Sequence, residues 1–458
     1  MRSGELGYWW RSLGGPPARH PPLVGSTEAD VAIIGAGYTG LWTAYYLKLA
    51  EPSLRIVVLE REIAGFGASG RNGGWVTGFF SGPPRLYEER GGRDGLAALQ
   101  RAMFATVDEV GRVLERHRID ADFIKGGQVR VALNRAQAVR LRELVGRSRR
   151  LGLGERDLRA LDTAELEQRL RVAGARCATF SPHAARVHPG KLLDGLARVV
   201  GDLGVRIHEG TPVTEVRPHE ALTSAGRVRA RWVVRATEGY TAGLRGLGRV
   251  LAPVNSSMII TAPLAPSAWR QIGWERAEVL GDGAHVYVYL QRTDDGRIAI
   301  GGRGVPYRFG SRTGGAGDTA PATVASLRER LVAMLPAAAG AEIDHAWSGV
   351  LGVSRDWGVS VVAQPGSGLA WAGGYVGAGV AAANLAGRTL RDLLLARSSS
   401  LTDMPWVGRR PRSWEPEPLR WAGIRATYAL YRLADRSERR SGRPSRLARF
   451  VDAATGRR

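Results

Sequence analysis

The sequence predicts an α/β protein with a Rossmann-type dinucleotide-binding domain and a second, α+β domain built on an antiparallel sheet. Two observations support this prediction. A strand, a glycine turn, a helix and a second strand follow one another within residues 30–60, which is the order of a nucleotide-binding βαβ unit. Polar and apolar residues alternate with period two in residues 251–345, which is typical of half-buried strands.

The βαβ unit begins with the apolar run 31–34, which has the composition of a parallel strand buried on both faces. Glycines follow at once at positions 35, 37 and 40. In this spacing the first glycine allows a tight turn, the second lets the backbone approach a pyrophosphate, and the third lets helix and strand pack closely. The sequence therefore predicts a phosphate-binding turn at residues 35–40.

A helix is predicted from Thr39, because large residues recur at helical spacing. These residues are Trp42, Tyr45, Tyr46 and Leu49. Its N-terminus would direct free N–H groups and the positive end of the helix dipole at phosphate. A purely structural βαβ unit without a ligand is the alternative, and the agreement of so many parts in order favours binding.

Glu60 ends the second predicted strand, twenty residues after Gly40. An acidic side chain at this place can accept hydrogen bonds from the hydroxyls of a ribose. An acid instead of a basic residue favours FAD or NAD over NADP, whose ribose carries an extra phosphate.

The next segment, residues 65–75, is rich in glycine with Ser, Arg and Asn between. Such a backbone can wrap closely round a ligand. A flexible surface loop is the alternative, and its place directly after Glu60 favours a ligand loop. Residues 368–395 again predict a strand, a glycine turn and a helix, so a second helix N-terminus is expected to point at the ligand.

In the second domain, residues 284–291 are predicted to form a strand with His285, Tyr287 and Tyr289 on one face. A turn at 294–296 leads to a returning strand, 297–302. The whole chain is divided as follows: an N-terminal arm, 1–27; the nucleotide-binding domain, 28–85, 183–250 and 346–397; the second domain, 86–182 and 251–345; and an Arg-rich helical extension, 398–458.

The composition sets further limits. The 458 residues carry a formal net charge of +22, and only Lys48, Lys125 and Lys191 are lysines, so 62 of the 65 basic residues are arginine. This charge is spread along the chain without a nucleic-acid-binding motif, so no specific nucleic-acid partner is expected. A single cysteine, Cys177, excludes a disulfide framework and a cysteine-based metal site.

No metal centre is predicted, because His188 has no second ligand near it in sequence and suits a turn before Pro189. The first ten residues lack the pattern of a signal peptide, and no run of 18 apolar residues suggests a transmembrane segment. We therefore expect a soluble, cytoplasmic protein.

These motifs, in this order, resemble the D-amino-acid-oxidase-like (DAO) family of FAD-dependent oxidoreductases, whose nucleotide-binding domain is of the GR2 type. The branch that contains gamma-glutamylputrescine oxidase is the most similar. The resemblance covers residues 28–397. It is carried by the βαβ unit with Glu60 and by segments 67–74, 188–189, 235–240, 301–303 and 373–380.

The resemblance implies non-covalent FAD, with the pyrophosphate at the first glycines, the ribose at Glu60 and the flavin near segment 374–380. Backbone N–H groups there would face the flavin edge on which negative charge develops. The implied FAD-binding residues are Gly35, Gly37, Tyr38, Thr39, Gly40, Glu60, Arg61, Gly67, Ala68, Ser69, Arg71, Asn72, Gly73, Gly74, Val213, Thr237, Gly374, Tyr375, Val376, Gly377, Ala378, Gly379 and Val380.

The implied reaction oxidises the C–N bond of a small amine or amino acid by hydride transfer to flavin N5. It leaves an imine and, with O2 as acceptor, hydrogen peroxide; another electron acceptor is the alternative. An NAD(P)H-using flavin reductase or monooxygenase is a rival interpretation, against which the missing second dinucleotide motif counts. A non-catalytic flavoprotein partner is the other rival.

The sequence departs from sarcosine oxidase-like members of the family at three places. The oxygen-activating lysine of those members has no counterpart near 298–300, and Ala378 and Ala381 stand where those members carry a histidine and a lysine. Cys177 is far in sequence from the flavin motifs, so no thiol is placed for a covalent flavin.

From these departures we expect that Arg303 assists reaction with oxygen, and that aromatic side chains hold the amine. The candidate catalytic residues are Tyr287, Tyr289, Arg303, Trp347 and Tyr375. Ordinary sheet packing is the alternative role for the two strand tyrosines. Arg71 or Arg308 is the alternative anchor, for a substrate carboxylate.

Overall fold

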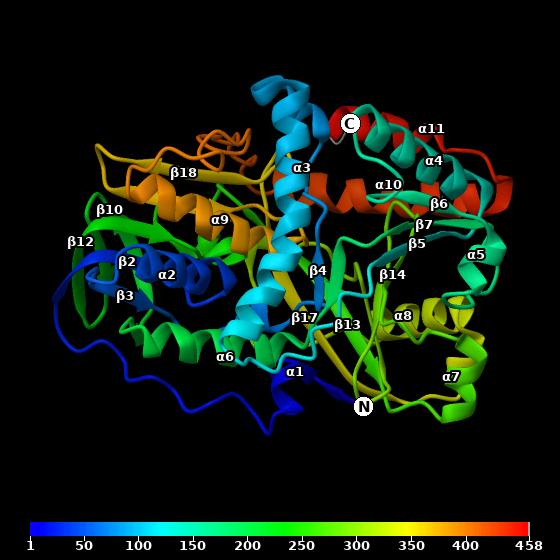
Figure 1. The fold of residues 1–458 in the computed structure, drawn as a ribbon, viewed down its shortest axis with the longest axis horizontal. Helices are drawn as coiled ribbons and strands as arrows, with labels where there is room; N and C mark the ends of the chain where they lie inside the picture. The colour runs from blue at the N-terminus through cyan, green and yellow to red at the C-terminus, as the bar shows by residue number, and fades with distance from the viewer. Residues whose placement is uncertain (457–458) are drawn as a thin grey trace.

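The computed structural model describes residues 1–456, which form two halves, each built on one sheet. The long helix α3 runs along the boundary between the halves (Figure 1). The two halves together fit the predicted fold class, a nucleotide-binding α/β domain with a second domain on a largely antiparallel sheet.

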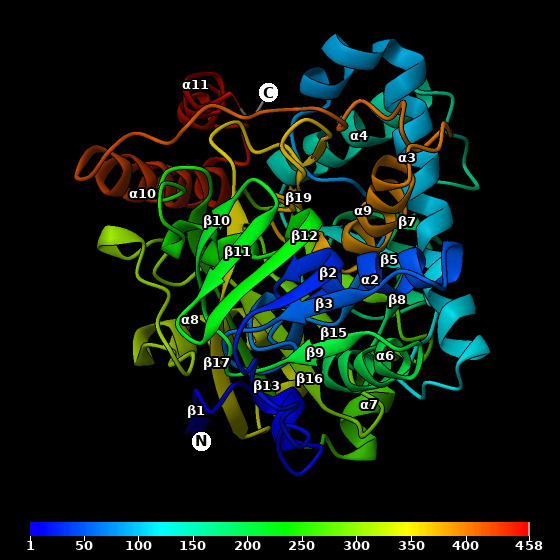
Figure 2. The same cartoon turned by 90° about the vertical axis from the view of Figure 1, so that its left-hand side faces the viewer.

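The eight-stranded sheet of the first half has a parallel centre, in which β2 lies between β3 and β12. Figure 2 shows its strands in the order β10-β11-β12-β2-β3-β9, and β19 pairs with β12 and with β18. The strands are β2 (Thr27–Ile34), β3 (Ile56–Leu59), β9 (Arg206–His208), β10 (Val213–Arg217), β11 (Glu220–Thr223), β12 (Gly226–Arg235), β18 (Ser360–Gln364) and β19 (Leu369–Gly373).

The nine-stranded sheet of the second half has the order β1-β17-β13-β16-β15-β14-β5-β7-β6. Its strands are β1 (Arg2–Ser3), β5 (Gln128–Ala132), β6 (Arg159–Leu161), β7 (Cys177–Ser181), β13 (Ala252–Thr261), β14 (Val279–Asp282), β15 (Tyr289–Arg292), β16 (Ile298–Gly302) and β17 (Ile343–Val353). A short ribbon of β4 (Trp75–Thr77) and β8 (Ala184–Arg186) lies beside them.

The main hydrophobic core lies between the eight-stranded sheet and helices α2, α3, α6 and α9. The α-helices are α1 (Tyr8–Arg11), α2 (Tyr38–Ala50), α3 (Pro84–Arg116), α4 (Arg135–Arg150), α5 (Thr163–Glu167), α6 (Pro189–Asp202), α7 (Pro266–Ile272), α8 (Pro321–Met334), α9 (Gly379–Leu394), α10 (Leu419–Ser441) and α11 (Arg446–Thr455). Four 3₁₀ turns are η1 (Ala68–Gly70), η2 (Glu238–Gly243), η3 (Phe309–Ser311) and η4 (Pro336–Ala338).

One predicted strand forms only in part. Residues 284–288 are a loop, and β15 begins at Tyr289, so His285 and Tyr287 do not share a strand face with it. The reason is that carboxylates replace a neighbouring strand as hydrogen-bond acceptors. Asp435 accepts from the N–H groups of His285 and Val286 at 2.9 and 3.0 Å.

The division of the chain also differs at one boundary. Residues 346–353, which the sequence analysis assigns to the nucleotide-binding domain, belong to β17 and pair with β13 of the nine-stranded sheet. Their alternating small and apolar residues suit either sheet, so only the long-range pairing separates them.

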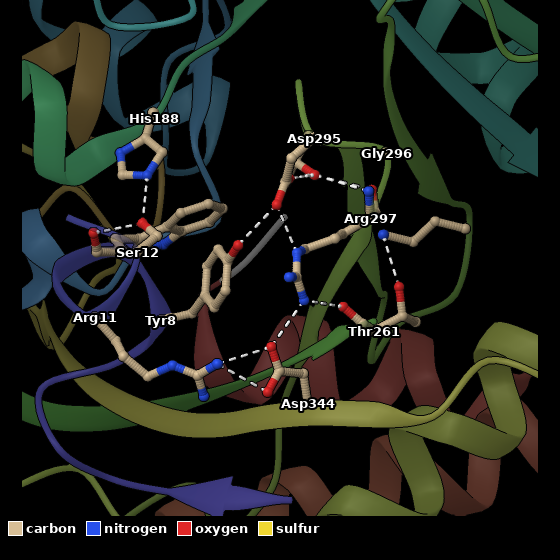
Figure 3. Close-up of polar contacts among 12 residues, drawn as sticks. Tyr8, Arg11, Ser12, His188, Thr261, Asp295, Gly296, Arg297 and Asp344 are labelled. Atoms are coloured by element: carbon tan, nitrogen blue, oxygen red, sulfur yellow. Dashed lines mark hydrogen bonds and ion pairs between the residues drawn. The ribbon is translucent and has the colours of Figure 1, made fainter. Parts of the chain in front are cut away.

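The N-terminal arm packs closely on the body. Trp9 and Trp10 are each 1% exposed, and β1 pairs with β17. Figure 3 shows the polar contacts around α1: the Tyr8 hydroxyl donates to Asp295 at 3.0 Å and Arg11 donates to Asp344 at 2.9 Å.

The C-terminal extension forms α10 and α11, which lie at the top of the second half (red in Figure 1). The last turns of α10 make polar contacts with the body, where Glu438 lies 3.0 Å from His285 Nε2. Within residues 1–456 the structure has no helix long and apolar enough to cross a membrane.

Candidate active site

The glycine turn between β2 and α2 has the close packing that its spacing predicts. Gly35 has φ +102°, and a Cβ there would lie 2.7 Å from the carbonyl oxygen of Ala236. A Cβ at Gly37 would lie 2.9 Å from Ser69 Oγ, and one at Gly40 would overlap the carbonyl oxygen of Gly35. Because only glycine fits at these three positions, no side chain covers the backbone, which stays accessible to a ligand.

Glu60 lies at the end of β3, where its carboxylate is buried. Oε2 accepts from the N–H of Ala36 at 2.8 Å and Oε1 from the N–H of Glu62 at 3.0 Å. Burial raises its pKa above the ordinary value. Each oxygen keeps a second acceptor site, so the carboxylate is oriented by the backbone and can still accept from hydroxyl groups.

Three adjoining cavities run from this turn towards the second sheet, and Ala68 lines all three. The first, the nucleotide cavity, is lined by Gly35, Gly37, Tyr38, Thr39, Glu60, Arg61, Gly67, Ala68, Ser69, Val213, Thr237 and Glu238, among others. The second, the linking cavity, is lined by Tyr38, Thr39, Ala68, Ser69, Asn72, Glu238, Tyr375, Val376, Gly377, Gly379 and Val380, among others.

Glu238 lines both of these cavities and was not identified in the sequence analysis. Its Oε1 accepts from the N–H groups of Gly374 and Tyr375 at 3.1 and 3.0 Å. Its Oε2 is buried and has no hydrogen-bond partner among the described residues. Burial raises its pKa to about 7, although nearby backbone N–H groups and the charge of Arg235 oppose the rise.

A signal for Glu238 exists in the sequence, since an acid directly follows Thr237 at the end of a parallel strand, β12. Its φ of +40°, unusual for a residue other than glycine, is visible only in the structure. Because its carboxylate takes the N–H groups of Gly374 and Tyr375, the free donors of segment 374–380 are those further along, at the start of α9. The first N–H groups of a helix have no partner within it.

The third cavity, here named the aromatic cavity, lies between the loop 68–73 and the second sheet. Seven aromatic side chains line it: Trp75, Phe79, Phe80, Tyr287, Tyr289, Trp357 and Tyr428. Tyr289 Oη is 2.8 Å from Ser256 Oγ, and a Cβ at Gly73 would lie 2.6 Å from the Tyr289 ring. The absence of a side chain at Gly73 therefore lets β15 approach the glycine-rich loop.

Arginines supply the charge of the aromatic cavity, which Arg71, Arg130 and Arg303 line together with His285. No Asp or Glu lines it among the described residues. Arg303 donates to the Asn255 carbonyl oxygen at 3.1 Å. Burial lowers the pKa of Arg303, but the phenols of Tyr428, Tyr287 and Tyr289 outweigh it and raise the net value.

The structure brings together only part of the predicted catalytic set. Tyr287, Tyr289 and Arg303 line the aromatic cavity, whereas Trp347 and Tyr375 do not. Trp347 is fully buried against Trp9 and donates to the Arg71 carbonyl oxygen at 2.9 Å. Tyr375 lines the linking cavity, with Oη 3.0 Å from Thr39 Oγ1.

The proposed carboxylate anchors are also separated by the structure. Arg71 lines the aromatic cavity, but its guanidinium donates to the carbonyl oxygens of Gly315 and Ser348 at 3.1 and 3.2 Å. Arg308 lies outside the cavity. Arg130, which the sequence analysis did not single out, lies inside it, carried there by β5.

Four of the predicted FAD-binding residues have other positions or special roles. Gly40 and Gly74 do not line these cavities; a Cβ at Gly74 would overlap the Val187 carbonyl oxygen, so this glycine serves packing. Gly374 also lines none of the three cavities, and its N–H donates to Glu238. Ala378 precedes the first turn of α9 and lines the aromatic cavity. The remaining predicted residues each line at least one of the three cavities.

Comparison with known proteins gives a consistent result. Residues 30–393 match the family described as FAD dependent oxidoreductase (DAO). The chain belongs to this family. The probable oxidoreductase OrdL of Haemophilus influenzae is 30% identical over 83% of this chain and 86% of its own length. The gamma-glutamylputrescine oxidoreductase of Escherichia coli is 30% identical over 81% of this chain and 84% of its own length.

Among solved structures, glycine oxidase from Geobacillus kaustophilus has a TM-score of 0.70 at 22% identity, covering 84% of this chain and 99% of that chain. This likeness supports the fold. The protein is thus an FAD-dependent oxidoreductase, and the predicted cofactor is confirmed. The residues present fit FAD, because three adjoining cavities follow one another from the glycine turn, Glu60 and the unpartnered Glu238 Oε2 towards the second sheet. Cys177, on β7, lines none of the three.

Proposed function

We propose that this DAO-family protein oxidises the C–N bond of an amine that also carries a carboxylate, either an amino acid or a longer acid with an amine group. The observation that carries the proposal is the aromatic cavity, which contains arginine and no acidic side chain among the described residues. Guanidinium groups without acidic partners attract an anion strongly. The naming of one relative as a gamma-glutamylputrescine oxidoreductase supports an amine substrate.

FAD, when bound, supplies the two-electron acceptor for the oxidation. The chain's own residues would hold it through the glycine turn, Glu60 and the backbone of residues 376–380. Glu238 Oε2 would accept a hydrogen bond from a hydroxyl of the cofactor's sugar chain. The α9 N-terminus would then face the cofactor with unpaired N–H groups and stabilise negative charge there.

On the substrate side, Arg303 and Arg130 would bind the carboxylate, and the rings of Tyr287 and Tyr289 would flank the amine. The seven aromatic side chains of the cavity would surround the reacting carbon. No carboxylate lines the cavity among the described residues, so no Asp or Glu is placed to act as a general base at the amine. The main contribution of the chain is therefore to orient the substrate.

Anaerobic mixing with pairs of compounds tests this function. Each pair consists of an amine and the same skeleton with a carboxylate added, and loss of flavin absorbance is followed. Faster reduction by the carboxylated member is expected. Equal rates for both members would overturn the carboxylate proposal, and reduction by NADH but by no amine would show a reductase instead.

The oxidising partner for the reduced protein is tested by admitting O2. Production of one hydrogen peroxide per imine identifies an oxidase. Reoxidation only by an artificial acceptor identifies a dehydrogenase. Because Arg303 is a buried positive charge in the cavity, loss of fast reoxidation in Arg303→Met with FAD retained would support its role in the reaction with oxygen.

A further inference from the structure

The C-terminal extension contributes to the aromatic cavity although it lies beyond residues 30–393, which match the family. Tyr428 of α10 lines this cavity and is 5% exposed. Its ring lies 6.0 Å from the Arg303 guanidinium carbon, within cation–π range. α10 is therefore part of the site, and not only a cover for the second sheet.

Polar contacts hold α10 against the two segments that carry cavity side chains. Arg432 donates to the carbonyl oxygens of Arg303 and Gly304, at 3.3 and 2.6 Å. Asp435 lies on the same side of the helix, about one turn after Arg432 and two turns after Tyr428. Its carboxylate accepts hydrogen bonds from the backbone of the loop that carries Tyr287. Tyr428, Arg432 and Asp435 are thus fixed relative to the loop and to the end of β16.

A buried network secures the end of this face. Glu438 is 2.8 Å from Arg140 and 3.0 Å from His285 Nε2. Although burial opposes it, hydrogen bonds from His285, the Ser445 N–H and Arg140 lower the pKa of Glu438 to about 2. His285, Asp435 and Glu438 have the side-chain types of a metal site, but the Arg140 guanidinium supplies their positive charge. This cluster is accordingly structural.

A fourth cavity, here named the adjoining cavity, lies beneath the extension. Its lining includes the apolar side chains Val254, Val353, Trp414, Leu419 and Ile424, together with the charged side chains Arg355, Glu415 and Arg420. Arg355 pairs with Glu415, and Arg420 pairs with Glu417. Two side chains, Trp357 and Tyr428, line both this cavity and the aromatic cavity. They form the partition between the two spaces.

We propose that Tyr428 of the C-terminal extension determines substrate specificity: with Trp357 it closes the aromatic cavity and limits the length of the chain that a carboxylated ligand can carry. This inference rests on the proposed function for the position of the carboxylate. Removing the Tyr428 ring joins the aromatic cavity to the adjoining cavity, so a longer ligand can lay its apolar chain against Val254, Val353 and Ile424.

The test measures binding of straight-chain monocarboxylates, from propionate to octanoate, to the FAD-loaded protein by titration calorimetry. In the natural protein the affinity is expected to fall once the chain exceeds the aromatic cavity. In Tyr428→Ala it is expected to rise with length by about threefold to fourfold per methylene, the value of a buried CH2 group. Tyr428→Phe keeps the ring and should keep the length limit.

Two further variants separate the possible failures. Gly423 lines the adjoining cavity, and a Cβ there meets no atom within 4 Å, so Gly423→Leu added to Tyr428→Ala should fill that cavity and restore the preference for short chains. Leu433→Ala, at an exposed position of the same helix, is the matched control. An unchanged length profile in a folded Tyr428→Ala protein overturns the inference, whereas no carboxylate binding to any form overturns the proposed anchor.

Discussion

The nucleotide cavity and the aromatic cavity are linked by the linking cavity and share Ala68 in their linings, but they are built differently. The nucleotide cavity is formed mainly by segments close to the ends of parallel strands, and its defining positions are glycines and one oriented acid. The aromatic cavity is formed by side chains from the nine-stranded sheet, β4, the glycine-rich loop, the segment 376–380 and α10, and its charged groups are cationic. Substitutions should therefore separate cofactor binding from ligand binding.

The largest effect is expected from Gly37→Val. The added Cβ would lie within 3 Å of Ser69 Oγ and stand where the backbone must approach a pyrophosphate. The purified protein should be folded by circular dichroism and colourless, because it retains no FAD. Gly201→Val, at a helical glycine whose Cβ would meet nothing within 4 Å, is the control and should be yellow. A yellow Gly37→Val protein would contradict the assignment.

The second prediction concerns the pH dependence of the FAD-free protein. The pKa of Glu238 is about 7 in the folded state against 4.5 ordinarily, so between these values the unfolded state releases the proton more readily. The contribution of Glu238 to the free energy of unfolding is therefore full below pH 4.5, falls as the pH rises to 7, and is constant above pH 7.

Urea unfolding of the natural protein and Glu238→Gln at several pH values measures this effect. The difference in unfolding free energy should change by about 3 kcal/mol across that range, the energy equivalent of the pKa shift. Parallel curves for the two proteins would mean that Glu238 does not titrate there.

The third prediction concerns the aromatic cavity alone. Arg303→Met should raise the KM of a carboxylated amine by about 30-fold, the loss expected of hydrogen bonds to a charged group, with FAD retention unchanged. Arg308→Met, five residues further along and outside the cavity, should leave KM unchanged. If Arg308→Met has the larger effect, the anchor lies there instead. Loss of FAD from Arg303→Met would show that the two cavities are not separable.

The smallest effect is expected from Trp9→Phe in the N-terminal arm. Trp9 Nε1 donates to the Asn72 carbonyl oxygen at 2.8 Å and so supports the glycine-rich loop from behind. Loss of this hydrogen bond should weaken the binding of FAD by about fivefold. The measurement is the dissociation constant of FAD from the apoprotein. Phe keeps most of the packing, so the melting temperature should change little. An unchanged dissociation constant would show that the arm does not influence the loop.

The sequence by itself determined the cofactor-binding half of this protein. Strand, glycine turn, helix and acid are contiguous, and the contacts proposed for the cofactor at the turn are made by the main chain. Glycine spacing therefore carries the information directly, and Gly37 and Glu60 lie where their pattern predicts. The resemblance extended this result to the family and to FAD, which the comparisons confirm.

Only the tertiary structure decided the composition of the aromatic cavity. Arg130, Tyr289 and Tyr428 are separated by more than a hundred residues and meet because β5, β15 and α10 pack together. Trp347 and Tyr375, which the sequence analysis placed in the same catalytic set as Tyr289, instead pack away from the aromatic cavity, against Trp9 and Thr39. A site made of backbone turns is local and follows from residue spacing, whereas a site made of side chains depends on long-range packing that no single segment encodes.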